Sequence, residues 1–353
     1  MMHSSEDDAF CRLLAGTGEL VSNVVFFGVK RKGRLLLCLP HDASAALNTL
    51  KLYQPQTKIA RWFVCCIRGL IWLRIHRLLP KIHMEIRDEG PLAKLKHQEG
   101  KIGILLGNPK GSCRCALVLR YDENQLVVDK VAVDKLASAS VKSEAIRIKS
   151  LPKSLRGLPH LCGNREGGNW ALYTTRYVDG RSIRAEQDHE VIDLLMEWQK
   201  NAEGKPMGEC KLWQSTAGLL RDAGKQNLLG RLSGIDDLPI KQGILHGDFA
   251  PWNIKRSTNG GIVVLDWEHG SLDGPAGWDW LHFVMQRGGL VEDLSAKDIL
   301  DKCRLWASQP EGQRLLQDAG WGTEIEWWIG SYLLYSQWMM GFDREGLITE
   351  WAQ

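Results

Sequence analysis

The order of apolar segments is the feature that most limits what this chain can fold into. From residue 21 to residue 178 short apolar runs alternate with turn residues, whereas beyond residue 185 the apolar residues recur at helical spacing. Short runs bounded by Gly, Asn, Asp and Pro predict strands, and a repeat of three to four residues predicts amphipathic helices. The sequence therefore predicts an α+β fold with a strand-rich first part and a mainly helical second part.

A length of 353 residues leaves room for about two domains. We expect an N-terminal α/β extension at 1–98, a small strand-rich lobe at 99–180 and a helical lobe at 181–353. In the first two parts, strands are predicted at 21–29, 34–39, 101–106, 113–121, 125–133, 159–162 and 170–178, helices at 57–80 and 138–150, a polar connector at 82–98 and a Gly-rich turn at 163–168. In the third, helices are predicted at 185–200, 211–223, 277–287, 296–307 and 326–340, with a strand-loop-strand around 244–266.

Charge is distributed unevenly along the chain. Residues 51–160 carry 21 basic and 9 acidic side chains, whereas residues 161–353 carry 19 basic and 28 acidic ones. A basic first half can face nucleic acid, anionic lipid or a phosphorylated ligand. No recognisable nucleic-acid-binding module accompanies the basic residues, and the acidic half would oppose such binding, so we expect no nucleic-acid partner.

The predicted helix at 57–80 is basic and apolar and contains no acidic residue. Its longest uncharged run is six residues, far short of a membrane-spanning segment. On a continuous helix Arg61 and Arg68 share one side, and Arg74 and Arg77 fall roughly opposite. Two interpretations remain open: peripheral contact with an anionic membrane surface, or packing on the rest of the protein with arginines that reach to solvent.

Cysteine usage points to a reducing compartment. The nine cysteines include no C-x-x-C pair, so neither a zinc knuckle nor a thioredoxin-like site is indicated. The polar, acidic first 19 residues do not fit a signal peptide. We therefore expect a cytoplasmic protein, located at the inner face of the membrane if 57–80 binds lipid.

One segment carries a pattern typical of catalysis. Residues 244–254 read I-L-H-G-D-F-A-P-W-N-I, and the apolar run 262–265 ends at Asp266. Two carboxylates and an amide on adjacent loops suit a hydroxyl that is activated beside a magnesium-bound phosphate. Asp248 would orient the acceptor hydroxyl and accept its proton, while Asn253 and Asp266 would offer hard oxygen ligands to Mg²⁺.

This pattern, H-G-D-x-x-x-x-N followed by D-W, resembles the aminoglycoside phosphotransferase/choline kinase family over about residues 100–345. The resemblance implies a bilobal protein-kinase-like fold, ATP and Mg²⁺ as cofactors, Asp248 as the catalytic base, and Asn253 and Asp266 as metal ligands. It also implies that His246 braces the catalytic loop and that Asp279, in G-P-A-G-W-D-W-L, anchors this loop. The motif further looks like that of phosphotransferase-like proteins from bacterial surface-polysaccharide loci.

The resemblance also assigns residues in the strand-rich lobe. The turn cluster 107–111, beginning at Gly107, would cover the phosphates. Lys130 lies in a predicted strand and Glu144 in the helix that follows, where a kinase-like lobe pairs a lysine with a glutamate. Backbone groups near Arg176 and Val178 would face the adenine.

Tryptophan is concentrated in the helical part, with ten of 15 residues at or after position 252. Such rings can stack on a sugar or cage a quaternary ammonium, and they can equally fill a core. Trp252, Trp321, Trp327 and Trp328 are the candidates for acceptor contact. Residues near Trp327 and Trp328 are also spaced as a buried helix face, so core packing remains the alternative.

The sequence therefore predicts an ATP-dependent phosphotransferase that acts on a hydroxyl of a small molecule or glycan intermediate, such as a sugar, an amino alcohol or an aminoglycoside-like compound. Two alternatives are a catalytically silent kinase-like protein that binds nucleotide and a membrane-surface scaffold that uses 57–80. The presence of Asp248, Asn253 and Asp266 favours the enzyme, since silent relatives usually lack a base or a metal ligand. The acceptor itself depends on loops that vary freely.

Overall fold

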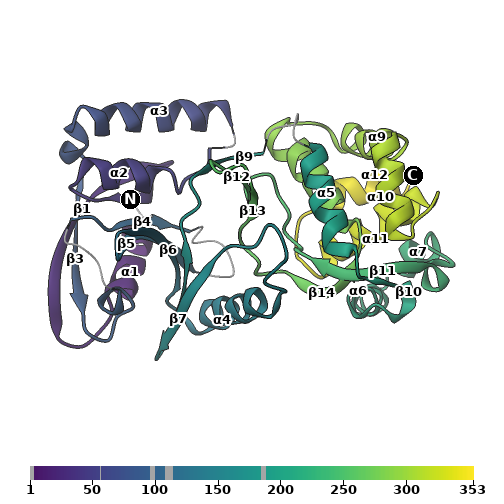
Figure 1. The fold of residues 1–353 in the computed structure, drawn as a ribbon, viewed down its shortest axis with the longest axis horizontal. Helices are drawn as coiled ribbons and strands as arrows, with labels where there is room; N and C mark the ends of the chain where they lie inside the picture. The colour runs from purple at the N-terminus through teal and green to yellow at the C-terminus, as the bar shows by residue number, and fades with distance from the viewer. Residues whose placement is uncertain (1–3, 56, 96–99, 108–113, 184–187) are drawn as a thin grey trace. The chain divides into compact units, whose positions relative to one another are not determined.

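The computed structural model describes residues 4–55, 57–95, 100–107, 114–183 and 188–353. The chain forms two compact units (Figure 1). Unit 1 comprises residues 1–150 and 159–179, and unit 2 comprises residues 151–158 and 180–353. Strands dominate unit 1 and helices dominate unit 2, which confirms the α+β class.

Unit 1 is built on an antiparallel sheet of eight strands in the order β3-β1-β2-β4-β5-β6-β8-β7. Its elements are α1 (Ser4–Ala15), β1 (Leu20–Arg31), β2 (Arg34–Leu39), α2 (Ala43–Leu50), α3 (Lys58–Trp72), η1 (Ile75–Leu78), β3 (Lys81–Arg87), η2 (Leu92–Lys94), β4 (Gly103–Leu106), β5 (Cys115–Asp122), β6 (Gln125–Ala132), α4 (Lys135–Ser150), β7 (Leu161–Gly167) and β8 (Trp170–Arg176).

Helices cover both faces of this sheet. The strand β1 shows this, because its successive buried side chains point alternately to the two faces. Val24 and Phe26 belong to a core that includes α1, whereas Phe27 and Val29 belong to a second core with α2 and α3. In Figure 1, α3 is the outermost layer of unit 1, with α2 between it and the sheet. This stacking gives α3 one buried side and one side that faces away from the unit.

The helix predicted at 57–80 is shorter than expected. The Thr57 hydroxyl accepts a hydrogen bond from Ala60 N and begins α3, a typical N-cap contact. The helix ends at Trp72, and Arg74 takes a left-handed backbone conformation with φ of 60°. Arg74 and Arg77 therefore lie outside α3, and the expected placement of these two residues on the face opposite Arg61 and Arg68 is wrong.

Three further differences concern the sheet. The expected connector at 82–98 contains β3, whose alternating side chains pair with β1, and the expected turn at 163–168 is mostly β7. The sheet also continues across position 98, because β2 pairs with β4 through Leu37 and Leu105. The expected extension and strand-rich lobe thus share one sheet. The predicted turn beyond Gly107 lies outside the described residues.

Unit 2 combines helices with two small three-stranded sheets, β10-β11-β14 and β13-β12-β9. Its elements are β9 (Gly180–Ser182), α5 (Asp188–Gln199), β10 (Glu203–Pro206), η4 (Met207–Glu209), α6 (Lys211–Asp222), α7 (Gln226–Gly230), η5 (Ile235–Asp237), β11 (Pro239–Leu245), β12 (Ile254–Ser257), β13 (Ile262–Val264), β14 (Ser271–Pro275), α8 (Trp278–Gln286), η6 (Arg287–Val291), α9 (Ala296–Ala307), α10 (Pro310–Ala319), α11 (Ile325–Trp338) and α12 (Glu345–Trp351). Along the described residues, no helix has the length and apolarity needed to cross a bilayer.

Candidate active site

The catalytic motif lies in the loop between β11 and β12 of unit 2. The loop begins at His246, directly after β11, and ends at Asn253, directly before β12. Gly247 has a φ of 82°, and a side-chain carbon there would lie 2.5 Å from the carbonyl oxygen of His269. Only glycine combines this backbone conformation with so close an approach. The sequence therefore needs glycine between the motif histidine and aspartate.

Asp279 anchors the start of this loop. It lies in the first turn of α8, and its two carboxylate oxygens accept hydrogen bonds from His246 N at 2.7 Å and Gly247 N at 2.9 Å. Asp279 is buried, and burial raises its pKa to about 7 even though the two N–H donors act in the opposite direction. The structure thus gives Asp279 the contacts expected of a loop anchor.

His246 is buried and braces a second loop. Its Nε2 lies 3.0 Å from the carbonyl oxygen of Leu265, and its ring packs against Trp267 with centroids 4.7 Å apart. Burial lowers the pKa of His246 to about 4, so the ring is neutral at pH 7. A fully buried imidazole cannot touch an acceptor, and we therefore regard His246 as a positioning residue.

Asp248 is held on both carboxylate oxygens. Asn253 Nδ2 donates to Asp248 Oδ2 at 2.9 Å, and His282 Nε2 lies 2.8 Å from Asp248 Oδ1. Burial raises the pKa of Asp248, but the contact with His282 and the nearby imidazoles of His246 and His269 outweigh it and lower this pKa to about 2. Asp248 is therefore an ionised carboxylate in a fixed orientation, with 16% of its side chain exposed.

His282 was not predicted as a site residue. It lies on α8 three residues after Asp279, and it is buried with its Nδ1 2.7 Å from the Tyr332 hydroxyl. A hydroxyl that donates to Nδ1 leaves the ring proton on Nε2, where it faces Asp248. The signal was present in the sequence, because residues three apart on a helix share a face.

The two predicted magnesium ligands lie on neighbouring chain segments. Leu265 N donates to Asn253 O at 2.8 Å, which joins the segment before Asp266 to the end of the catalytic loop. Asp266 follows β13 by two residues and has a φ of 69°, a left-handed conformation that is uncommon for aspartate. Since Asn253 Nδ2 is used by Asp248, its Oδ1 and the Asp266 carboxylate offer the hard oxygen donors that Mg²⁺ prefers.

In unit 1 the structure brings Lys130 and Glu144 together. Lys130 Nζ on β6 lies 2.8 Å from Glu144 Oε2 on α4, and the Tyr173 hydroxyl on β8 donates to Glu144 Oε1 at 2.7 Å. Glu144 is fully buried and Lys130 is 9% exposed. The predicted lysine–glutamate pair therefore exists as a buried, hydrogen-bonded contact.

Three further residues of unit 1, Gly107, Arg176 and Val178, are predicted to lie near the nucleotide. Gly107 N donates to Cys115 O at 3.0 Å, and a side-chain carbon at Gly107 would lie 2.4 Å from that oxygen. Arg176 N donates to His160 O, so this N–H group is already used within the sheet. Val178 is half-buried. The expectation that other backbone groups near Arg176 and Val178 face adenine stays a prediction.

The candidate tryptophans fall into two groups. Trp321 and Trp328 are at most 1% exposed, and the Trp321 indole donates to Ala276 O at 2.8 Å. These two rings are core, and the expected acceptor contacts through them are wrong because no ring surface faces solvent. Trp252, next to Asn253, and Trp327 are half-buried and remain candidates.

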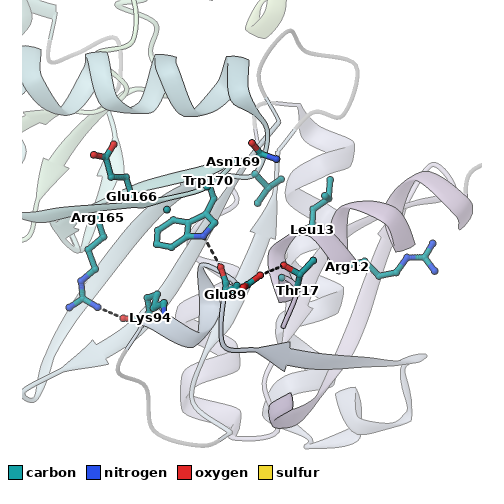
Figure 2. Close-up of a pocket in the computed structure, with 13 residues that line it drawn as sticks. Arg12, Leu13, Thr17, Glu89, Lys94, Arg165, Glu166, Asn169 and Trp170 are labelled. Atoms are coloured by element: carbon teal, nitrogen blue, oxygen red, sulfur yellow. Dashed lines mark hydrogen bonds between the residues drawn. The ribbon is translucent and has the colours of Figure 1, made fainter. Parts of the chain in front are cut away.

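A separate cavity of about 870 Å³ opens on unit 1 between α1, η2 and the β7–β8 hairpin (Figure 2). Several of its polar groups bond to each other: the Trp170 indole donates to Glu89 O, Thr17 donates to the Glu89 carboxylate, and Arg165 donates to Lys94 O (Figure 2). Because these bonds fasten the segment around Glu89 to the sheet, we assign them a structural role.

No protein-family model matches this sequence, and a comparison with curated proteins finds no match. Solved structures do match. The structure is similar to aminoglycoside phosphotransferase APH(4)-Ia, with 12% identity, a TM-score of 0.47, and coverage of 70% of this chain and 90% of that chain.

Two other similar structures are phosphotransferases by description. Aminoglycoside-3'-phosphotransferase of type VIII has 15% identity and a TM-score of 0.36, over 70% of this chain and 92% of that chain. Choline kinase from Cryptosporidium parvum Iowa II has 11% identity and a TM-score of 0.41, over 74% of this chain and 88% of that chain. These are enzymes of the group that the motif resembles. Because the identities and TM-scores are this low, the chemistry of this chain has to be inferred from its own residues.

Proposed function

We propose that this chain is an ATP-dependent phosphotransferase that moves the γ-phosphate of ATP to a hydroxyl of a small molecule or glycan intermediate. The observation that carries the proposal is the environment of Asp248, an ionised carboxylate fixed by Asn253 Nδ2 and His282 Nε2 on a loop anchored by Asp279. Phosphoryl transfer requires little covalent chemistry from the protein, so positioning of the acceptor hydroxyl is the main task of such a residue.

The low pKa of Asp248 defines how it would act. A carboxylate with a pKa of about 2 does not remove a hydroxyl proton before phosphoryl transfer begins. It accepts a hydrogen bond from the hydroxyl, directs the oxygen lone pair, and receives the proton once the bond to phosphorus forms. Mg²⁺ held by Asn253 and Asp266 would neutralise phosphate charge. Lys130, oriented by Glu144, would contact the phosphates.

The acceptor class is the part of this proposal that rests on the resemblance. A thermostable mutant of aminoglycoside phosphotransferase APH(4)-Ia, also similar in structure, forms a ternary complex with ADP and hygromycin B. Sugars, amino alcohols and glycan intermediates are the acceptors to compare first. Trp252, half-buried beside Asn253, is the first aromatic candidate to contact them, because Phe249 and Trp267, which follow Asp248 and Asp266, are fully buried.

The test measures ATP consumption by the purified chain with each acceptor, for the wild type and for Asp248→Asn. We expect the variant to lose about 10²–10⁴-fold in kcat while it still binds ATP in a calorimetric titration. Asp222→Asn, an exposed aspartate at the end of α6, is the matched control and should keep full activity.

Two outcomes would contradict the proposal. Wild-type turnover by Asp248→Asn would exclude this residue from catalysis. ATP binding without turnover on any acceptor would favour the alternative of a catalytically silent nucleotide-binding protein.

A further inference from the structure

One face of α3 in unit 1 exposes large apolar side chains that the fold does not use. We call it the α3 surface and define it by Ile59, Trp62 and Trp72 of α3, Leu78 of the following η1, and Arg61 and Arg68. The four apolar residues are 72–85% exposed. Two tryptophans this exposed within one short segment are unusual for a surface that faces only water.

The positions of the buried residues around α3 explain why the unit does not cover this face. Val64, Ile67 and Ile71 recur at a spacing of three to four residues and pack into the core with α2. At 100° per residue, Trp62 lies nearly opposite this buried side. The exposed cysteines, Cys65 and Cys66, fall on the same outward side as Trp62. The helix is therefore apolar on two opposite sides, and only one of them is covered by the unit.

Basic side chains flank the apolar face. Arg61 and Arg68 lie together along one edge of α3, since seven residues complete nearly two helical turns. From residue 43 to residue 84 the sequence contains seven Lys or Arg residues and no Asp or Glu. In the part of the chain that the structure describes, no ion pair involves Arg61, Arg68 or Arg74. Lys51, further along the same segment, pairs with Asp179, but the arginines of the α3 surface itself are positive and available to an anionic partner.

We propose that the α3 surface docks onto an anionic lipid bilayer, with α3 lying in the plane of the membrane. Trp prefers the boundary between headgroups and acyl chains, and arginine can reach the lipid phosphates while its stem stays among apolar groups. The proposal concerns elements that the proposed catalytic loop does not use, so it stands apart from the proposed phosphotransferase activity.

Two other occupants fit the surface less well. A second copy of the chain across a two-fold axis would bring each α3 surface against its own equivalent, with Arg61 and Arg68 of both copies close together and no acidic residue to compensate. Nucleic acid would meet the arginines but would leave Trp62, Trp72 and Ile59 against phosphate or water. A bilayer alone supplies an apolar layer directly beneath a layer of negative charge.

The experiment is flotation of the purified full chain with vesicles of phosphatidylglycerol and phosphatidylcholine, compared with vesicles of phosphatidylcholine alone. The wild type should float with the anionic vesicles, and less so in high salt, which screens the arginines. Arg61→Gln with Arg68→Gln should lower the partition coefficient about 25-fold, because each basic side chain near an anionic surface contributes about fivefold. Trp62→Ser with Trp72→Ser should abolish flotation.

Matched control variants test whether flotation depends on the α3 surface or on exposed apolar and basic side chains anywhere in the protein. Leu136→Ser with Ile146→Ser removes two side chains of α4 that are 66% and 69% exposed, and Arg221→Gln with Arg231→Gln removes two exposed arginines of unit 2. Both controls should float like the wild type. All variants should keep wild-type unfolding midpoints, since the replaced side chains face solvent, and should keep the wild-type rate of ATP turnover in the absence of vesicles.

Failure of the wild type to float with anionic vesicles would overturn the proposal, as would equal flotation of the tryptophan variant. A concentration-dependent dimer in analytical ultracentrifugation, lost in the tryptophan variant and accompanied by no flotation, would assign the surface to self-association instead.

Discussion

At the scale of single residues, the orientation of Asp248 depends on contacts with neighbouring side chains. Asp248 is fixed by Asn253 and His282, and His282 in turn contacts Tyr332. Each contact removes one way for the carboxylate to rotate. Preorganised geometry of this kind is what phosphoryl transfer gains from a protein, because the reaction itself needs little more than alignment and charge.

His282 should therefore affect turnover more than substrate binding. We expect His282→Leu to lower kcat about 10- to 100-fold, because Asp248 keeps only its Asn253 contact, and to leave the KM for ATP close to the wild-type value. His282→Gln retains a side-chain N–H donor and should recover part of the loss. Steady-state kinetics of the two variants, with exposed His83→Gln as the control, measure this difference. Equal kcat for Leu and Gln variants would show that His282 only fills space.

His246 should make stability depend on pH in the acidic range. Its pKa falls from 6.5 to about 4 on folding, so the folded state favours the neutral ring. The resulting stabilisation is fully present above pH 6.5 and is lost as pH falls toward 4, by about 3 kcal/mol in total. His282, whose pKa is also lowered by burial, acts in the same direction.

Urea unfolding between pH 7 and pH 4.5 measures this loss. Asp279, with a pKa raised to about 7, stabilises the folded state as pH falls and so opposes the histidines. The effect of His246 is therefore measured as a difference: with decreasing pH, the free energy of unfolding of the wild type should fall relative to that of His246→Gln. His83→Gln should match the slope of the wild type, because His83 is exposed. Parallel slopes for the wild type and His246→Gln would mean that other groups control acid stability.

At the scale of elements, the Lys130–Glu144 pair joins β6 to α4. Lys130→Met leaves a fully buried carboxylate without its cation, and we expect a loss of about 3–5 kcal/mol in the free energy of unfolding. The double variant Lys130→Met with Glu144→Gln removes both charges and should recover part of this loss. Urea denaturation of the three proteins gives the coupling energy directly.

The same helix offers a control. Lys142 on α4 forms an ion pair with Glu166 on β7, and the two side chains are 48% and 63% exposed. Lys142→Met should cost less than about 1 kcal/mol, because solvent screens an exposed pair. A cost for Lys130→Met no larger than that for Lys142→Met would indicate that the buried pair contributes little to joining β6 and α4.

The elements also show what sequence patterns can predict. The segment from β5 to α4 was predicted within a few residues, because short loops and clear turn residues separate its apolar runs. The segment K-I-H-M-E-I-R of β3 alternates apolar and polar residues as a strand does, but most of it falls in the polar stretch 82–98, whose overall polarity predicts a connector. The burial of Trp328 depends on packing between helices far apart in the sequence, which no local pattern encodes.

At the scale of the whole molecule, the pairing of β2 with β4 changes the expected division of unit 1. A strand pattern indicates where a strand lies and says nothing about which strand pairs with it, so a boundary at 98/99 was compatible with the sequence. In the structure Leu37 pairs with Leu105 and Cys38 with Ile104, which closes one sheet over both segments. One core contains Phe26 and Met84 together with Ile104, Val118 and Val131.

The fragment 99–179 should consequently fail to fold alone, whereas 1–179, which keeps the whole sheet, should unfold cooperatively in urea. Removing residues 1–98 exposes an edge of β4 and the apolar side chains that Phe26 and Met84 cover, and both changes favour aggregation. Size-exclusion chromatography and circular dichroism of the two fragments test this expectation under identical conditions. A cooperative transition of 99–179 with a urea midpoint equal to that of 1–179 would contradict the single sheet as one folding unit. It would instead support the boundary that the sequence predicts, because the strands from β4 to β8 would then stabilise one another without β2.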